Sequence, residues 1–519
     1  MRFKKMLTSL LVAGMTLSMI TGCSNNTSST TSGNNTQNNG AIAEGKANIS
    51  MMLVDYEGSP LTGEHADEVI NKMEEYTNTH VDFTFVPDDS YEDKLSLTLA
   101  SPSDMPMIIG VGKMSGVIVS ASEAGAFWDL KDYIKDTDKY PNLSQANENV
   151  NQSLTIGGKL IGIYKARAIG RNGMGYRADW AEKLGLDEPK TIEDVYNMMY
   201  QFRYGDPDGN GKDDTYGLSL CKYTGPFDIM QTWFGCGNGW VEQNGELIPV
   251  FQTPEYKEAL DWFKKMYDDG LVYEDWAVRD TATWLDTIKN GECGIYIDVL
   301  DGSRRAWDYF ENEKVPSVVD SSKIASMNLV GAINNKTLAT SGYNGFFVIT
   351  KAADTPEKVE ACLNYLDKMC DDEMIILSSY GLEGIHWELD DKGYLVDLDA
   401  GDLVASKAYQ ALNQTVAYIP NLVATNPVVE QNERKQLEEK VKAENEAYAV
   451  FNPASSYLVN SPTYSLSGST LDKLIDDART QYICGQIDEA GLQAQWDLWL
   501  KQGGQDVINE VNEQYKANK

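Results

Sequence analysis

Residues 47–88, ANISMMLVDYEGSPLTGEHADEVINKMEEYTNTHVDFTFVPD, decide the fold. The first ten and the last eight residues of this stretch are rich in apolar, β-branched and aromatic residues, and they predict two strands. The residues between them predict a helix, because three side chains recur on one helical face: Val69, Met73 and Tyr76.

The same alternation continues with a predicted helix over 91–99 and an apolar run at 105–112. Strand, helix, strand, helix and strand in this order imply right-handed crossovers and a parallel sheet, so the predicted class is α/β. Ligands of such sheets bind in loops beyond the carboxyl ends of the strands. This rule singles out Asp55, Tyr56 and the turn at 110–115.

A second αβ unit begins near Gly158. Thr191 with Asp194 three residues later predicts a capped helix, and residues 253–270 predict another. A strand is predicted at 291–299. A chain of 519 residues is too long for a single core, so we expect at least two lobes.

The N-terminus has the form of an export signal, with three positive charges before an uncharged apolar stretch. Residues 20–23, Ile-Thr-Gly-Cys, resemble the bacterial lipobox, which predicts a lipoprotein signal peptide over 1–22 and a lipid on Cys23. The alternative is an ordinary secretory signal with a chance cysteine. The polar residues that follow predict a flexible tether, so that the lipidated cysteine and tether occupy 23–46.

The chain is strongly acidic, with a formal net charge of −34. Such a surface repels phosphate backbones and anionic lipid headgroups, so we expect no nucleic-acid partner and no membrane contact beyond the lipid anchor. The same composition predicts no basic cleft, which argues against uronate ligands. Arg167 and Arg171, in the predicted crossing region, leave uronates open.

Six cysteines follow Cys23, without a CxxC motif. Cys221 could pair with Cys236, whereas Cys362 and Cys370 lie too far apart along one predicted helix to be bridged. We therefore expect buried free thiols at Cys221, Cys236, Cys293, Cys362, Cys370 and Cys484.

The sequence contains three histidines and no HExxH, GxSxG or phosphate-binding glycine loop. No glycosidase-type carboxylate pair stands out among the 78 acidic residues. We therefore expect a protein that is not an enzyme.

Residues 206–214, DPDGNGKDD, reproduce the first part of an EF-hand calcium loop, with a glycine at the sixth position for the sharp turn. The twelfth position is Gly217, which cannot supply the bidentate carboxylate. We expect a structural Ca²⁺, and the alternative is a metal-free acidic turn. The predicted ligands are Asp206, Asp208, Asn210, the carbonyl of Lys212, and Asp214.

Aromatic residues in loops that contain glycine predict ligand contacts, because a flat apolar face stacks on the CH face of a sugar ring. Asp104 and Arg171 are the candidate polar partners. The aromatic candidates are Trp233, Trp240, Trp387, Tyr176, Tyr296 and Tyr343.

With these motifs, the chain resembles solute-binding lipoproteins of carbohydrate ABC importers, in the extracellular solute-binding protein family 1 and its LplA type. The resemblance covers essentially the whole mature chain. Beyond the lipobox, it rests on ASPSDMP (100–106), the stretch 175–219 with the calcium-like loop, YGLEGIHWELDDKG (380–393) and the C-terminal stretch 482–515.

The resemblance implies a two-lobed periplasmic-binding-protein-like fold of type II, with discontinuous lobes joined by a hinge. Lobe 1 would comprise 47–157 plus about 332–390. Lobe 2 would comprise 158–330 plus about 391–519, with C-terminal helices bracing both lobes. In relatives that bind acidic oligosaccharides, a structural Ca²⁺ sits in the corresponding loop.

The implied function is capture of a sugar or oligosaccharide between the lobes and its delivery to the permease subunits of an ABC importer. The protein would be a monomer, lipid-anchored at the extracellular face of the cell membrane of a Gram-positive type bacterium. Two other interpretations stay open at this point: an oligopeptide-binding lipoprotein, and a surface protein that binds or degrades polysaccharide.

Overall fold

The structure is a computed structural model that describes residues 45–517, apart from residues 57, 400 and 401. The predicted signal peptide, Cys23 and nearly all of the tether lie outside the described residues. Within the described part of the chain, no helix is both long enough and apolar enough to cross a membrane.

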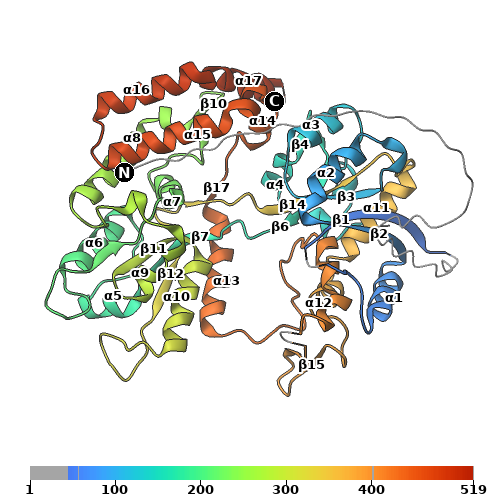
Figure 1. Ribbon diagram of the computed structural model, residues 1–519, viewed down its shortest axis with the longest axis horizontal. Helices are drawn as coiled ribbons and strands as arrows, with labels where there is room; N and C mark the ends of the chain where they lie inside the picture. The colour runs from blue at the N-terminus through green and yellow to red at the C-terminus, as the bar shows by residue number, and fades with distance from the viewer. Residues whose placement is uncertain (1–44, 57, 400–401, 518–519) are drawn as a thin grey trace, which may run out of the picture. The chain divides into compact units, whose positions relative to one another are not determined.

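The first sheet combines strands from both halves of the chain (Figure 1). Its β1–β2 and β1–β3 pairs are parallel, which confirms the predicted strand–helix–strand alternation, whereas β14 runs antiparallel to its two neighbours. In spatial order the strands are β2 (Thr79–Pro87), β1 (Ala47–Asp55), β3 (Ile108–Val111), β14 (Tyr343–Ile349) and β6 (Gly162–Ala166).

Helices pack on this sheet through the apolar residues that the sequence periodicity predicts. Val69 and Met73 of α1 and Tyr91 and Leu95 of α2 are all buried in the first core. The helices of this core include α1 (Ala66–Thr77), α2 (Asp88–Leu99), α3 (Gly116–Glu123), α4 (Glu148–Ser153), α11 (Pro356–Lys368) and α12 (Asp372–Tyr380).

The second sheet has its own hydrophobic core. Its strands, in spatial order, are β12 (Met327–Val330), β7 (Asn172–Arg177), β11 (Cys293–Val299) and β8 (Tyr216–Leu218). The helices beside it include α5 (Ala178–Leu184), α6 (Ile192–Tyr204), α7 (Gly225–Trp233), α8 (Pro254–Asp268), α9 (Asp286–Lys289) and α10 (Leu300–Glu313).

The predicted helix caps of this unit are present. Thr191 and Asp194 form a reciprocal capping box at the start of α6, which satisfies backbone N–H groups that would otherwise lack partners. At the start of α8, the Thr253 hydroxyl accepts a hydrogen bond from the backbone N–H of Tyr256.

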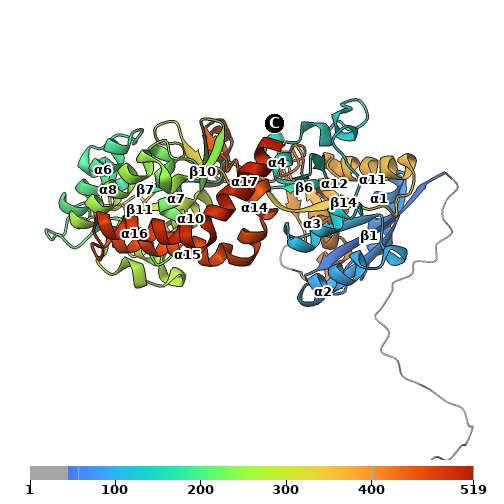
Figure 2. The same ribbon diagram turned by 90° about the horizontal axis from the view of Figure 1, so that it is seen from above.

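All of the C-terminal helices except the first pack mainly in the second core (Figure 2). The first packs through Val441 in a separate small apolar cluster. Within α14, however, Val459 packs against the first core while Tyr457 and Leu458 are buried in the second. The helices are α13 (Glu433–Asn445), α14 (Ser455–Val459), α15 (Pro462–Ile483), α16 (Glu489–Trp499) and α17 (Gln505–Ala517).

The chain crosses from one core to the other at positions that differ from those expected. We expected the first boundary at residue 157, but β6 pairs with β14 as an edge strand of the first sheet. We expected the last boundary between the lobes at about residue 390, but side chains up to Ile419 are buried in the first core. The crossings therefore lie at 167–171, 331–342 and 420–432.

The reason is that strand pairing and burial, rather than local turn signals such as Gly157–Gly158, decide where a core ends.

Small two-stranded sheets complete the structure. They pair β4 (Thr155–Ile156) with β5 (Lys159–Leu160), β9 (Trp240–Gln243) with β10 (Glu246–Pro249), β13 (Thr337–Leu338) with β17 (Ala449–Val450), and β15 (Trp387–Leu389) with β16 (Leu395–Asp397).

The six cysteines in the described part of the chain are all free, as expected. Burial raises the pKa of the Cys362 and Cys370 thiols to about 12. They therefore remain protonated and unreactive at neutral pH.

Candidate functional site

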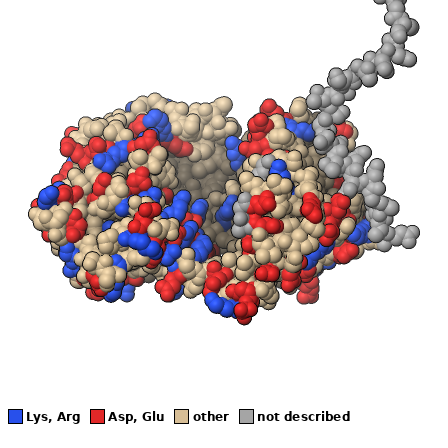
Figure 3. Space-filling model, turned by 60° about the horizontal axis from the view of Figure 1, so that its bottom comes forward, with Lys and Arg blue, Asp and Glu red and all other residues tan. Residues whose placement is uncertain are grey.

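A cavity of about 780 Å³ is lined by residues of the first core, by Arg171 and Asp301 beside the second sheet, and by residues of α13. Figure 3 shows the corresponding face hollowed, with Lys and Arg side chains along the border of the hollow. From the first sheet come the residues at the carboxyl ends of β1 and β3, together with Lys165 and Ala166 of β6. This is the location that the topology of a parallel sheet predicts for a ligand site.

One part of the cavity wall is aromatic. Tyr56 is 62% exposed directly after β1, and the partial burial of the ring and the charge of Asp88 raise the pKa of its hydroxyl. Tyr91 is held in place because its hydroxyl donates to the carbonyl of Gly110. The aromatic side chains of the wall are Tyr56, Tyr91, Phe347, Tyr380 and Tyr418. Such a wall suits the apolar face of a sugar ring.

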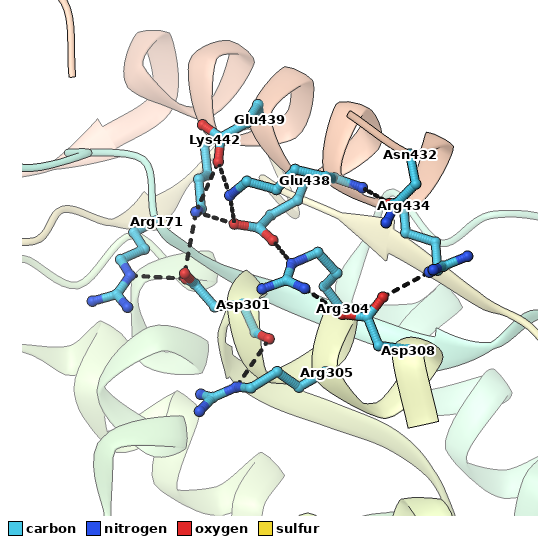
Figure 4. Close-up of polar contacts among 11 residues, drawn as sticks. Arg171, Asp301, Arg304, Arg305, Asp308, Asn432, Arg434, Glu438, Glu439 and Lys442 are labelled. Carbon is cyan, nitrogen blue, oxygen red and sulfur yellow. Dashed lines mark hydrogen bonds and ion pairs between the residues drawn. The ribbon is translucent and has the colours of Figure 1, made fainter. Parts of the chain in front are cut away.

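Another part is a network of ion pairs between α13, α10 and the segment that leads into β7 (Figure 4). Glu438 is fully buried and accepts from both Lys442 and Arg304. The carboxylate of Asp301 accepts hydrogen bonds from Arg171 Nε at 2.8 Å and from Lys442 Nζ at 3.3 Å. Burial would raise the pKa of Asp301, but these two cations outweigh it and hold the pKa at about 2.

The cavity is not acidic, although the chain as a whole is. It is lined by five cationic side chains, Lys165, Arg167, Arg171, Lys435 and Lys442, and by four acidic ones, Asp88, Glu92, Asp301 and Glu439. The two signs nearly balance, so the cavity is close to neutral. The acidic residues that dominate the composition lie mainly elsewhere on the chain.

Three of the residues predicted for ligand binding lie at this site. Tyr56 and Arg171 line the cavity, and Asp55 lines an adjoining pocket of about 110 Å³ with Tyr56. Asp55 also accepts a hydrogen bond from the backbone N–H of Gly58 at 2.7 Å. Asp55 ends β1 and Tyr56 follows it directly, which is why the strand-end rule could find these two residues.

The three predicted tryptophans lie elsewhere. Trp233, at the end of α7, and Trp240, in β9, are buried in the second core. Trp387 is buried in a small cluster with Ile376 and Leu395, and its indole N–H donates to the carbonyl of Gly381 at 3.1 Å. Their glycine-containing context therefore marks tight packing, and none of them lines the cavity.

The remaining predicted residues also lie outside the cavity lining. Tyr176 and Tyr296 are buried in strands, and the hydroxyl of Tyr176 accepts from Asn328 Nδ2 at 2.9 Å. Tyr343 packs edge-on against Phe346 at a ring-centroid distance of 6.4 Å. Asp104 ends the short 3-10 helix η1 (Pro102–Asp104), where it accepts from the hydroxyl of Ser101.

Sequence reasoning missed several residues of the cavity. The position of Tyr91, one helical turn after the carboxyl end of β2, could have predicted a place at the ligand site. Its helical periodicity predicted only that the side chain is buried in the core. Lys165 carried a similar signal near the end of β6. Gln414, Tyr418 and Lys442 come from distant segments that only the folded chain brings to the site.

The loop 206–214 joins α6 to β8 and forms a hydrogen-bonded turn. The backbone N–H of Gly211 donates to both carboxylate oxygens of Asp206 at 3.2 Å, which its φ of 76° permits. Asn210 Nδ2 donates to Asp208 Oδ2 at 2.7 Å and to Asp214 Oδ1 at 3.0 Å.

The donor set of this loop consists of oxygen atoms only, which is the chemistry of a hard cation such as Ca²⁺. In the part of the chain that the structure describes, however, no three His, Cys, Asp or Glu side chains are grouped closely enough to hold a metal ion. The Asn210 amide bridges the carboxylates in this arrangement.

Two αβ cores with a large shared cavity at the ends of the first sheet define a solute-binding protein. The chain belongs to the family described as bacterial extracellular solute-binding protein, which matches residues 68–376.

Two relatives from Bacillus subtilis (strain 168) match nearly the whole chain. Lipoprotein LipO is 36% identical over 530 residues, covering 100% of this chain and 99% of the relative. The polygalacturonan/rhamnogalacturonan-binding protein YtcQ is 31% identical over 495 residues, covering 92% of this chain and 94% of the relative.

Solved structures show the same fold. A solute-binding protein of Bifidobacterium longum infantis, described as HMO-binding and associated with an ABC transporter, superposes with a TM-score of 0.60 at 18% identity, covering 91% of this chain and 99% of that one. An EF-hand mutant of the Streptococcus pneumoniae protein FusA, in complex with fructo-nystose, gives 0.51 at 19% identity, covering 91% and 100%.

Proposed function

We propose that this protein captures an oligosaccharide in the 780 Å³ cavity and delivers it to the permease of an ABC importer. The observation that carries the proposal is the cavity itself, which is lined by aromatic side chains together with charged and amide side chains. Aromatic faces stack on sugar rings, and polar side chains receive the hydroxyl groups. The relative YtcQ, which is named as a polygalacturonan/rhamnogalacturonan-binding protein, supports the same ligand class.

The anchoring part of the proposal concerns Cys23. A lipid on this cysteine would hold the monomeric protein at the extracellular face of a Gram-positive type membrane, with the tether giving it reach. The name of the relative LipO, a lipoprotein that aligns with the whole of this chain, supports this location.

The calcium part of the proposal concerns the loop 206–214. Asp206, Asp208, Asn210, the Lys212 carbonyl and Asp214 would hold a structural Ca²⁺ that fixes the end of α6 against the start of β8. The all-oxygen donor set supports this, and so does the EF-hand named in the structure of FusA. Because Gly217 supplies no carboxylate, we expect a stabilising site rather than a conformational switch.

The ligand class is tested by thermal unfolding of the chain from Ser24 onward, which retains every described residue. Mono- and oligosaccharides and short peptides are each added, and a ligand at 100 times its Kd should stabilise the protein by about 2.7 kcal/mol. A rise in midpoint with saccharides alone is expected. A rise with peptides alone, or release of shortened saccharides during incubation, would contradict the proposal.

The metal is tested in the same assay without ligand. EDTA should lower the unfolding midpoint of the wild type, and added Ca²⁺ should restore it. Asp208→Ala should remove this sensitivity, because a loop ligand is lost. Asp320→Asn is the control, since it removes another exposed turn carboxylate, one that accepts from Ser322. An EDTA effect of equal size in wild type and Asp208→Ala would place the metal elsewhere.

A further inference from the structure

Two of the cations that line the cavity have no acidic partner among the described residues. Lys165, in β6, donates from Nζ to the neutral Gln414 Oε1 at 2.9 Å and lies 5.9 Å from the centre of the Phe347 ring. Arg167 follows two residues later and is exposed. No described carboxylate lies within ion-pair distance of either side chain.

The other three cations of the cavity are already neutralised. Arg171 pairs with Asp301, and Lys442 pairs with Asp301 and the buried Glu438. Lys435 pairs with Glu438 and Glu439, the latter at 2.5 Å. The unpaired positive charges of the cavity therefore lie on one short segment, 165–167, at its first-sheet side. The two remaining acids of the lining, Asp88 and Glu92, lie on α2 and form no described ion pair with either cation.

Burying part of an unpaired positive charge costs free energy, and a bound anion would offset that cost. Desolvation of Lys165, together with the charge of Arg167, lowers the pKa of the Lys165 ammonium to about 8. The neighbours of this pair include Tyr418, whose hydroxyl has a pKa raised by burial, and the neutral side chains of Phe347 in β14 and of Gln414 in the 3-10 helix η8 (Gln410–Thr415). None of these described neighbours supplies the negative charge that an unpaired, partly buried cation requires.

We propose that the ligand is an anionic oligosaccharide, with Lys165 and Arg167 binding the carboxylate of a hexuronate unit while Tyr56 and its aromatic neighbours stack on the sugar rings. This inference rests on the proposed function and narrows its ligand class. Two adjacent cations recognise a carboxylate by charge-assisted hydrogen bonds, and the amide of Gln414 fixes the position of the Lys165 ammonium.

The proposal is tested by isothermal titration calorimetry at pH 7. The probes are trisaccharides of galacturonate, glucuronate and mannuronate, each with its carboxyl-reduced, neutral counterpart. At least one acidic trisaccharide should bind more than tenfold more tightly than its neutral counterpart. Lys165→Gln should weaken binding of that acidic probe at least tenfold and change binding of the neutral one less than twofold.

Two further variants separate a local loss of charge at the cavity from a change in net charge or in folding. Lys473→Gln removes an exposed positive charge on α15, outside the cavity, and should leave both affinities unchanged. Arg167→Gln, an exposed position, repeats the test if Lys165→Gln fails to fold.

The pH dependence gives a readout that a structural role would not produce. In the wild type, affinity for the acidic probe should fall as pH rises through about 8, because Lys165 loses its proton. Lys165→Arg keeps its charge at these pH values, so its affinity should stay constant from pH 7 to 9.

The proposal is overturned if neutral trisaccharides bind as tightly as acidic ones. It is also overturned if Lys165→Gln and Arg167→Gln each change the acidic affinity less than threefold. In both cases oligosaccharide capture itself stands. If neither acidic nor neutral saccharides bind the wild type, the proposed function fails together with this inference.

Discussion

Tyr56 and Trp233 are both aromatic residues close to a glycine, but their surroundings assign them opposite roles. The Tyr56 side chain is 62% exposed at the cavity, where a sugar ring can cover it. Trp233 is 2% exposed in the second core. The residue types around an aromatic side chain therefore do not show whether it contacts a ligand or packs in a core. The exposed fraction of the side chain does distinguish the two.

Substitution of these two residues should separate affinity from stability. Trp233→Ala should lower the free energy of unfolding by about 3–5 kcal/mol, because it opens a cavity in the core. Tyr56→Ala should change it by less than about 0.5 kcal/mol, as for other surface positions. Urea unfolding and ligand titration measure the two effects.

Affinity should show the reverse pattern. Tyr56→Ala should weaken saccharide binding about fivefold or more, which corresponds to the roughly 1 kcal/mol of an aromatic contact. Trp233→Ala should leave Kd within about twofold at a temperature where the variant is folded. A large loss of affinity in folded Trp233→Ala would mean that Trp233 contributes to ligand binding after all.

The same contrast shows how much of the site the sequence could reveal. Asp55 and Tyr56 were found because a topological rule ties them to the end of a parallel strand. The tryptophans were chosen by local composition, which does not report what a folded neighbour covers. Lys165 and Lys442 line one cavity from segments far apart in the chain, so no local pattern could have joined them.

Among the elements, α13 depends unusually strongly on charge. Its contact with α10 and β12 has a small apolar cluster, formed by Leu300, Leu329 and Val441, beside the ion pairs of Glu438. Glu438 is fully buried, and its cationic partners lower the pKa of its carboxyl despite the opposing effect of burial. The ion pairs therefore fix the position of α13 at the cavity wall.

Glu438→Gln should destabilise the protein by about 3 kcal/mol at neutral pH, because Lys442 loses a buried charged partner. The lowered pKa means that this contribution is present above the ordinary value of 4.5 and is lost as pH falls through the folded-state pKa. The difference between wild type and variant should therefore shrink in acid. Urea unfolding at neutral pH and again in acid, below the ordinary pKa of a glutamate, measures it.

Glu444→Gln provides the matched control on the same helix. Glu444 forms an exposed i,i+4 pair with Lys440 at 3.8 Å, so its loss should cost less than about 0.5 kcal/mol. Equal destabilisation by the two substitutions would mean that helix propensity, rather than the buried network, accounts for the effect.

Most regular elements could be predicted, because their signals are local. The capping residues Thr191 and Thr253 mark helix starts by side-chain chemistry, and the apolar period marks the buried faces of α1 and α2. β6 was assigned to the wrong lobe because its pairing partner β14 lies far away in the sequence. Pairing between distant strands has no local signature.

In the whole molecule, α13 packs beside the second sheet, although the segment that precedes it in the chain packs in the first core. Gly170 lies so close to it that an added Cβ would collide with the carbonyl oxygen of Lys442. Asn445 Nδ2 donates to the carbonyls of Gly170 and Asn172, each at 2.9 Å. Any relative motion of the cores should therefore carry α13, with Lys435 and Lys442, together with the second sheet.

Ligand binding should bring the two cores closer together, because one ligand contacts Tyr56 and Lys165 on the first sheet and the charged wall of α13 and α10 on the other side. Small-angle X-ray scattering should show a smaller radius of gyration with saturating saccharide than without it. Tyr56→Ala, at concentrations that saturate only the wild type, should show no change. An unchanged radius in a wild type that calorimetry shows to be saturated would mean that the cavity is preformed, and that the crossings at 167–171, 331–342 and 420–432 do not act as hinges.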